Sequence, residues 1–356
     1  MAQLAYAASM IMDSLLDVSS RGGLDALNAF TDMSEGARPG QSLTMVEPGT
    51  LTVQTAGGNA IAAEALNMTT HQLVVDLPAM VSVYVERIED IVGLNGGMRD
   101  KVAADAWNQL REHVAGDIIN RTRDALVGPT LDVGLIANSG AATLTDAHVN
   151  QAEALLRRRP GVGKTAQLSW VGSDGFEAAV KGLINYQPVT EQVGVGQISA
   201  LNKMPVFTTS HLPSAAGDES VPTTASVIAS AVGTQTIASG HGIIRGGLWT
   251  TTGLTANAAT PVAVSATTAT SASLAIASAD ANPQADGIGA MVSASSLGLL
   301  AHKARVAFAF AGNAFDVYII KSPTGAGWIV QVCTTYGVKV LPGAMLAIHA
   351  PALPLS

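Results

Sequence analysis

The hydrophobic pattern of the chain changes once between residues 51 and 126, from a period of two residues to a helical period. In the first part, apolar side chains alternate with polar ones on both sides of the glycine pair Gly57 and Gly58. The alternating apolar residues are Leu51 and Val53 before the pair, and Leu73, Val75 and Leu77 after it. A two-residue period is typical of β-strands, and a glycine pair ends a strand. The pattern therefore predicts a long two-stranded arm over residues 50–85. Because an isolated hairpin is at best marginally stable in water, we expect this arm to need a partner surface.

A helical period takes over from Met98 to about Leu126. Apolar residues recur every three or four positions on one face, at Ala103, Trp107, Leu110, Val114 and Ile118. This spacing predicts one continuous helix, which at 1.5 Å per residue is about 40 Å long. We expect Trp107 to lie in the core, because it falls on the apolar stripe, and Arg111 to lie on the polar side.

Helical and strand patterns alternate beyond Gly128. The spacing predicts a helix over 146–158, a strand over 167–171 and a helix over 174–184, with Ser173 as the N-cap of the last. Period-two runs return later in the chain, at Val306, Phe308, Phe310, Phe315, Val317, Ile319, Trp328, Val330 and Val332. Helices mixed with strands in this way predict an α+β fold.

The segment from His211 to about Gly287 is rich in Thr, Ser, Ala and Gly, and Arg245 is almost the only charge in its middle. Short alternating pieces at Val262, Val264, Leu274 and Ile276 indicate strands. A disordered low-complexity loop is the alternative. The frequent β-branched residues favour a small β insertion.

The charge balance limits the partners of the chain. Of its 356 residues 48% are apolar and only 13% are charged, and the formal net charge is -8. The length and apolar fraction suit two folded domains, or one large domain with an insertion. The acidic balance excludes a broad basic face that grips nucleic acid. The one dense basic run, residues 157–159, is expected to be a solvated helix end rather than a phosphate contact.

Cysteine usage and the N-terminal pattern indicate the compartment. Cys333 is the only cysteine, so the sequence predicts no intrachain disulfide and a reducing compartment. No basic residue precedes Arg21, and Asp13 interrupts the apolar stretch, which is wrong for a secretory signal. The uncharged stretch 246–279 is too rich in Thr, Ser and Asn for a membrane span, so no membrane contact is expected.

One motif suggests an enzyme. Residues 161–165 (GVGKT) end like a phosphate-binding loop, but Arg158 stands at the first glycine position, and a helix precedes the turn where the motif needs a strand. The seven histidines form no HExxH or HxH pair, and no GxSxG motif is present. We therefore predict no catalytic residue, no cofactor and no metal, and we expect that the protein is not an enzyme.

Three stretches carry a resemblance to a known family. Residues 83–91 (VYVERIEDI) lead into the predicted helix, residues 196–213 (GQISALNKMPVFTTSHLP) join a short strand to a polar turn, and residues 336–350 (YGVKVLPGAMLAIHA) place two strands around a proline. In this order they resemble the major capsid protein of tailed double-stranded DNA bacteriophages (Caudoviricetes), which has the Hong Kong 97-like fold.

The resemblance implies a division of the chain into named parts. These are an N-terminal arm (1–44), an extended loop or β-hairpin (45–85), a peripheral domain with a long spine helix (86–130), the first part of an axial domain (131–213), a β-rich insertion (214–287) and closing strands of the axial and peripheral domains (288–356).

The resemblance also implies a function and partners. It implies a viral structural protein of the virion that self-assembles in the host cytoplasm into hexamers and pentamers, which form an icosahedral capsid around double-stranded DNA. Implied partners are a separate scaffolding protein, because only some forty residues precede the hairpin, a portal protein, a possible decoration protein, and packaged DNA through weak non-specific contact. No lysine precedes Lys101, so an isopeptide bond from the hairpin is not expected.

Candidate residues for contact between subunits are Leu51, Val53, Gly57, Gly58, Leu73, Val75 and Arg111. A bare strand pair with apolar side chains and few charges is an aggregation hazard unless a neighbour covers it. Two alternative functions stay open at this point, an encapsulin-type bacterial nanocompartment shell and, with less support, a P-loop nucleotide-binding enzyme. A secreted β-rich adhesin is a weaker alternative, which the missing export signal opposes.

Overall fold

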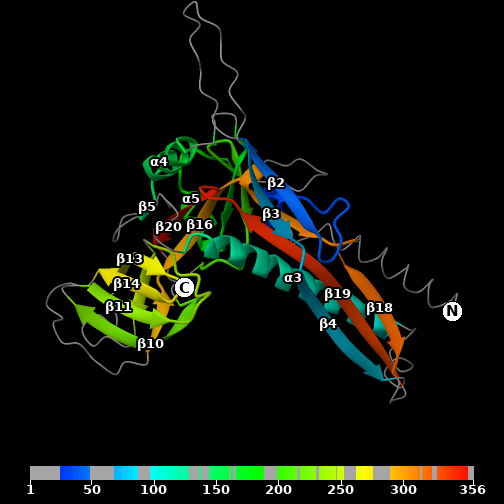
Figure 1. The fold of residues 1–356 in the computed structure, drawn as a ribbon. Helices are drawn as coiled ribbons and strands as arrows, with labels where there is room; N and C mark the ends of the chain where they lie inside the picture. Colours follow the sequence, from blue (N-terminus) through cyan, green and yellow to red (C-terminus); the bar gives the residue numbers. More distant parts are fainter. Residues whose placement is uncertain are drawn as a thin grey trace, which may run out of the picture. The chain divides into compact units, whose positions relative to one another are not determined.

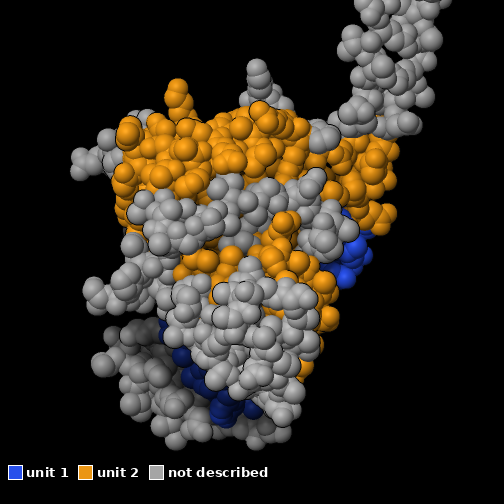
Figure 2. All heavy atoms as spheres, turned by 90° about the vertical axis from the view of Figure 1, so that its left-hand side faces the viewer, with its two compact units in different colours: residues 1–43, 73–119, 307–339 blue, residues 44–72, 120–306, 340–356 orange. Residues whose placement is uncertain are grey.

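The computed structural model describes residues 25–48, 68–86, 97–127, 136–137, 144–159, 162, 166–187, 199–214, 217–229, 232–245, 247–251, 262–275, 289–312, 315–322 and 327–351. The chain divides into two compact units (Figure 2). Unit 1 holds residues 1–43, 73–119 and 307–339, and unit 2 holds residues 44–72, 120–306 and 340–356. Both contain helices and strands, so the predicted α+β class is confirmed.

Unit 1 is built on a five-stranded sheet in which β1 (Thr31–Asp32), β17 (Val306–Phe310), β19 (Gly327–Val340) and β18 (Asp316–Lys321) follow one another. The fifth strand, β4 (Leu77–Glu86), also pairs with β19. Figure 1 shows β4, β19 and β18 side by side. The period-two runs after residue 305 are thus confirmed as strands. A short 3-10 helix, η2 (Asp25–Ala29), precedes β1.

Helix α3 (Gly97–Asp124) confirms the predicted long helix, and at 1.5 Å per residue it is about 42 Å long. It packs on the sheet through Trp107, whose ring centroid lies 5.5 Å from that of Phe315. Tyr336 in β19 donates a hydrogen bond from its hydroxyl to Asp117 Oδ2 at 2.6 Å. Trp107 is buried, so its predicted place in the core is confirmed.

The strand that ends at Glu86 takes a different partner from the one the sequence suggested. β4 pairs with β19 along its whole length, from Leu77 opposite Tyr336 to Glu86 opposite Gly327. Valines face valines across this pair, since Val81 lies opposite Val332 and Val83 opposite Val330. A two-residue period identifies a strand but not its partner, and here apolar cross-strand contacts with a strand 250 residues later decide the pairing.

The strands that flank the predicted arm form a separate two-stranded sheet of β2 (Ser42–Pro48) and β3 (Met68–Val74). The first of these lies upstream of Leu51, where the sequence pattern placed it. Residues 49–67, which include the predicted glycine turn, lie outside the described residues.

Unit 2 contains a seven-stranded sheet with the strand order β5-β20-β16-β6-β9-β8-β7. Its strands are β5 (Ile136–Ala137), β20 (Met345–Pro351), β16 (Ser295–His302), β6 (Leu168–Gly172), β9 (Met204–Thr208), β8 (Ser199–Leu201) and β7 (Tyr186–Gln187). Every residue of β16 and β6 is buried, because the two strands lie in the middle of the sheet and helix α5 (Asp174–Val180) packs on them. Helix α4 (Asp146–Arg157) packs on the neighbouring strands β20 and β5. A 3-10 turn, η4 (Lys303–Arg305), follows β16.

Helix α5 begins as predicted and ends early. The Ser173 hydroxyl accepts a hydrogen bond from Phe176 N at 3.2 Å, which confirms Ser173 as the N-cap. The helix ends at Val180 rather than at Ile184, and Gly182 follows directly in the turn. The Asp146 carboxylate accepts hydrogen bonds from the backbone N–H groups of Ile184 and Asn185, which hold the chain in that turn.

The Thr- and Ser-rich segment forms a closed barrel with the strand order β10-β11-β14-β13-β12-β15 (yellow and light green in Figure 1). Its strands are β10 (Ser220–Ala229), β11 (Val232–Ile237), β12 (Leu248–Thr251), β13 (Val262–Thr268), β14 (Ser271–Ala275) and β15 (Gly289–Ser293). Its interior is filled by Ile237, Ile243, Trp249, Val264, Ala272, Leu274 and Met291. For the described residues, the predicted β insertion is confirmed over a disordered loop, and its last strand continues to Ser293.

Candidate functional site

One face of the sheet in unit 1 is apolar and exposed. Strand pairing aligns side chains across β4, β19 and β18, so Tyr84, Ile329 and Ile320 form one row on the same face. Tyr84 is 46% exposed and Ile320 is 49% exposed. Neighbouring positions of the same strands add Met80 and Tyr318, which are 59% and 48% exposed. We call Met80, Tyr84, Tyr318, Ile320 and Ile329 the apolar sheet face.

The other face of these strands is buried within the chain. Val330 and Val332 are fully buried, and their cross-strand partners Val81 and Val83 lie on the same side. The strands therefore carry large apolar side chains on both sides, with Ser82, Gln331 and Asp316 between them on the exposed face. A strand with two apolar sides is normally covered on both faces of its sheet. Among the residues that the structure describes, only the face with Val330 and Val332 is buried.

Sequence reasoning missed the apolar sheet face, although a signal was present. Within Met80–Val85 (MVSVYV), apolar side chains stand at both odd and even positions, and Tyr318–Ile320 (YII) does the same. The two-residue period of Val81, Val83 and Val85 identifies the strand, but it does not include Met80 and Tyr84 on the other side. Apolar residues at both odd and even positions of a strand indicate that both faces of its sheet are buried in the functional protein.

The β2–β3 pair holds two of the predicted contact residues. Leu73 and Val75 are fully buried within their own chain, whereas Val74, Val46 and Met68 are exposed. Val75 N–H donates to Gln41 O at 3.0 Å, and Gly40 N–H donates to Val75 O at 2.7 Å, so the backbone is anchored at this point. Contact of Leu73 and Val75 with a neighbouring subunit stays a prediction.

The remaining predicted contact residues lie elsewhere. Leu51, Val53, Gly57 and Gly58 lie outside the described residues. Arg111 is buried rather than on a polar surface, with its guanidinium carbon 5.1 Å from the centroid of the Trp107 ring. At this distance a guanidinium is attracted to the face of an indole. Its predicted role in subunit contact stays a prediction.

A charged cluster in unit 2 fixes the part of the β2–β3 pair that leads into residues 49–67. The Arg305 guanidinium pairs with the Glu47 carboxylate and also donates to Pro342 O at 2.8 Å. His71 Nε2 in β3 lies 3.4 Å from Glu47 Oε2. Arg305 thus ties Glu47 in β2 to the backbone of Pro342, and His71 in β3 lies beside the same carboxylate.

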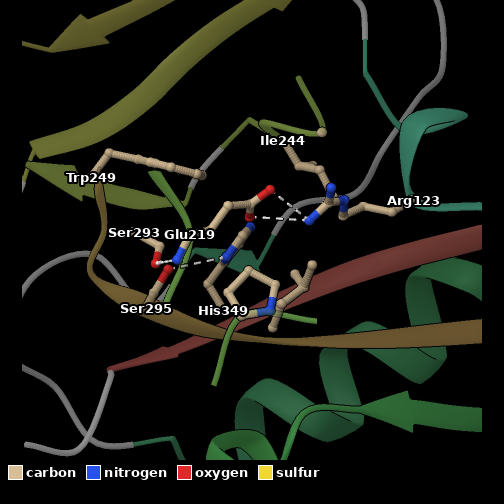
Figure 3. Close-up of a pocket in the computed structure, with 10 residues that line it drawn as sticks. Arg123, Glu219, Ile244, Trp249, Ser293, Ser295 and His349 are labelled. Carbon is tan, nitrogen blue, oxygen red and sulfur yellow. Dashed lines mark hydrogen bonds and ion pairs between the residues drawn. The ribbon is translucent and has the colours of Figure 1, made fainter. Parts of the chain in front are cut away.

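The base of the barrel carries the other notable charge pair (Figure 3). Arg123 Nη1, from the last turn of α3, lies 3.0 Å from both carboxylate oxygens of Glu219. Burial raises the pKa of Glu219, while the charge and hydrogen bond of Arg123 act in the opposite direction. Beside them, Ser295 Oγ lies 3.4 Å from His349 Nδ1.

His349 itself lies buried in β20. Burial lowers the pKa of its imidazole to about 4, which leaves the ring neutral near pH 7. The cavity that Arg123, Glu219, Ser295, Trp249 and His349 line measures about 10 Å³, the room of a single water molecule. The barrel base is therefore a packed junction and has no space for an organic ligand or cofactor.

An open cleft of about 540 Å³ adjoins this junction, lined by Asn120, Arg123, Asp174, Ser210, His211, Leu212, Pro213, Ser214, Asp218 and Glu219. Its openness to solvent and its acidic lining do not match a closed catalytic pocket. Among the described residues, no cluster of three or more His, Cys, Asp or Glu side chains could hold a metal ion.

Residues 161–165 (GVGKT) lie between a helix and a strand in the order that the sequence predicted. Helix α4 precedes them and strand β6 follows, the reverse of a phosphate-binding loop. Val162 is buried, and the other residues of 161–165 lie outside the described residues. In the described part of the chain, none of the helices is both long and apolar enough to cross a membrane.

Comparison with known proteins adds to this geometry. No protein-family model matches the sequence, and no curated protein matches it. Solved structures do match. The capsid of Ralstonia phage GP4 is 10% identical in sequence, covers 95% of this chain and 92% of its own chain, and has a TM-score of 0.52.

Two further structures are similar at lower TM-scores. The capsid of cyanophage P-SCSP1u is 12% identical, with 91% of this chain and 87% of that chain covered and a TM-score of 0.48. The head of Helicobacter pylori bacteriophage KHP40 is 9% identical, with 94% and 91% covered and a TM-score of 0.48. The likeness to the phage GP4 capsid shows that this chain has a phage-capsid fold. The implied likeness to phage capsid proteins is thus confirmed at the level of the fold, while the division into a peripheral domain with a spine helix, an axial domain and an extended loop stays a prediction.

Proposed function

We propose that this chain is the major capsid protein of a tailed double-stranded DNA bacteriophage. It assembles into hexamers and pentamers, which close into an icosahedral head around packaged DNA. The observation that carries the proposal is the likeness in fold to the capsid of Ralstonia phage GP4 across 95% of the chain. A likeness over nearly the whole chain leaves little of the protein for an unrelated activity.

The apolar sheet face supports assembly from many copies. Met80, Tyr84, Tyr318 and Ile320 are each about half exposed in the single chain. An exposed apolar patch of neighbouring large side chains marks a surface that another protein covers. Obligate interfaces bury on the order of 2,000 Å² or more, so this face supplies one part of a larger contact.

In this proposal each part of the fold has a role in the shell. Helix α3 is the spine helix of a peripheral domain, the seven-stranded sheet is the axial domain near the axis of each hexamer or pentamer, and the barrel is the β-rich insertion. The β2–β3 pair and residues 49–67 between them form the extended loop, which lies across a neighbouring subunit. The Arg305–Glu47 pair holds the loop at its base.

The proposed partners follow from the same role. A separate scaffolding protein directs assembly, a portal protein occupies one vertex, and a decoration protein can bind the outer surface. The net charge of -8 supports weak, non-specific contact with DNA, because a strongly basic wall would hold the genome and oppose its release. The protein acts as a component of the virion and not as an enzyme.

Electron microscopy of the expressed chain tests the proposal. The chain should form closed shells of uniform diameter when it is produced with its scaffolding protein, and light scattering should give hexamers or pentamers as building blocks. A protein that stays monomeric at all concentrations, with or without the scaffold, would count against it. Shells that enclose an enzyme rather than DNA would favour the nanocompartment alternative.

A further inference from the structure

The barrel is joined to the seven-stranded sheet by two neighbouring stretches of backbone. The chain enters β10 after Glu219 and leaves β15 through Ser293 and Ser295 into β16. These stretches bond to each other: Gly217 N–H donates to Ser293 O at 2.8 Å, and Ser293 N–H donates to Glu219 O at 2.8 Å. These two stretches form a narrow hinge. Leu248 N–H borders it with a bond to Ser295 Oγ at 3.2 Å, so contacts at the barrel base limit rotation about the hinge.

A side chain from outside the barrel crosses this hinge. Arg123 lies in the last turn of α3 and donates a hydrogen bond to the carboxylate of Glu219, the residue directly before β10. Figure 3 shows the two side chains pointing toward each other. Arg123 is buried, so the pair lies where water screens it little.

Arg123 also holds a second part of the barrel, the loop between β11 and β12. Gly242 in this loop has φ +65°, and a Cβ placed there would lie 2.1 Å from Arg123 Nη2. The guanidinium therefore lies directly against the backbone of Gly242. His241 fixes the same loop, because Ile243 N–H donates to His241 Nδ1 at 3.0 Å, and His241 Nε2 lies 2.9 Å from Thr268 O.

We propose that the contact of Arg123 with Glu219 and Gly242 is a lock that holds the β10–β15 barrel in one orientation on the seven-stranded sheet. When the lock opens, the barrel pivots on its two covalent connections while its own fold stays intact. Arg123 is suited to this because its planar fork bonds a carboxylate on one side and stacks on a flat backbone surface on the other. The lock is a property of the single chain and does not depend on shell assembly.

Two variants open the lock by different means. Glu219→Gln keeps the shape of the side chain but removes the charge that Arg123 pairs with. Gly242→Ala places a methyl group in the space of the guanidinium. The matched control is Glu153→Gln, because Glu153 also pairs with an arginine, Arg157, at 2.7 Å, but on helix α4 and away from the barrel.

Spin labels measure the orientation directly in the full chain. Cysteines are introduced at Ala225 in β10 and Ala154 in α4, two exposed positions, in a background in which Cys333→Ser leaves no other thiol. Double electron–electron resonance then gives the distribution of distances between barrel and sheet. We expect this distribution to become about twofold wider in Glu219→Gln and in Gly242→Ala, and to stay unchanged in Glu153→Gln.

Hydrogen exchange separates a lock from a merely stabilising contact. Amides of the hinge, such as those of Gly217 and Ser293, should exchange about tenfold faster in the two lock variants. Amides of β11 and β14 inside the barrel should keep their wild-type rates. Unchanged distances in both lock variants would overturn the proposal, and so would faster exchange throughout β11 and β14, because the contact would then stabilise the barrel rather than orient it.

Discussion

At the scale of single residues, burial of His349 links the stability of the fold to pH. Its pKa is about 4 in the folded chain, below the ordinary value of 6.5, because burial disfavours the charged ring. The unfolded chain therefore takes up the proton first as pH falls. The free energy of unfolding should decrease between pH 6.5 and about pH 4, by up to about 3 kcal/mol.

Thermal unfolding at a series of pH values measures this effect. His349→Gln removes the titrating group, so its melting temperature should depend less on pH across this window than that of the wild type. His113→Gln is the control, because it removes a histidine that is exposed on α3 rather than buried. Equal pH dependence in His349→Gln and the wild type would show that the ring does not carry the effect.

A second residue-scale prediction concerns the space around Phe176. A Cβ on Gly298 in β16 would lie 2.4 Å from the Phe176 ring, which is fully buried. Gly298→Ala should therefore lower the free energy of unfolding by about 1–3 kcal/mol through overpacking, as measured in urea. Gly182→Ala is the control, since its Cβ would meet only ordinary contact at 4.0 Å. A neutral effect of Gly298→Ala would mean that the Phe176 ring moves aside at little cost.

At the scale of elements, the apolar sheet face separates folding from assembly. The double variant Tyr84→Thr with Ile320→Thr places a β-branched residue, which suits a strand, at both positions and removes apolar area that is exposed in the single chain. The melting temperature of the unassembled protein should stay within a few degrees of wild type, because little buried contact is lost. The yield of shells in electron micrographs should fall several-fold.

Val83→Thr is the matched comparison for this face. Val83 lies on the opposite, buried side of β4, across from the fully buried Val330. Val83 is half-buried, so its replacement places a hydroxyl against Val330 and should lower the stability of the isolated chain by about 1 kcal/mol. Normal shell yield from the exposed double variant would mean that a different surface carries the assembly.

The elements also show how far local patterns reach. Helix α3 and the N-cap Ser173 could be predicted because their signals are local, a stripe of apolar residues and one hydroxyl before a helix. The partner of β4 could not be predicted, since β19 lies 250 residues away and any strand with apolar alternation would have matched. The contact of Arg111 with Trp107 did have a local signal that sequence reasoning missed, because the two residues are four positions apart and therefore share one face of the helix.

The charge pairs of unit 2 mark the same limit. Nothing in the sequence near Glu219 or Glu47 indicates that Arg123 and Arg305 lie beside them, at separations of 96 and 258 residues. Sequence periodicity reports which side of an element faces the core. It does not report which elements meet, so pairs formed across the sheet or at the barrel base need the folded chain.

At the scale of the whole molecule, the extended loop should matter for assembly and not for folding. Replacing residues 52–65 with a short Gly-Ser linker keeps β2, β3 and the Arg305–Glu47 pair. The variant should be soluble, with a circular dichroism spectrum and melting temperature close to wild type, because β2, β3 and the contacts that hold them are all retained. It should form no closed shells.

A linker of the same length that replaces part of the barrel loop 252–261 is the comparison. This segment joins β12 to β13 and has no part in the proposed extended loop. Shells should still form from the comparison variant. Normal particles from the 52–65 replacement would contradict the role given to the extended loop.

The closed barrel also has a consequence for the evolution of such a protein. The chain segments on the two sides of the barrel are hydrogen-bonded to each other, because Leu297 N–H donates to Pro213 O at 3.1 Å. If the barrel were removed, the two cut ends would therefore lie about 5 Å apart, the Cα separation of paired strands. A foreign domain whose termini lie that close could be spliced in without disturbing β16. Recombination could therefore exchange the whole module in one event, and engineers could use the same position to display a peptide or a reporter domain.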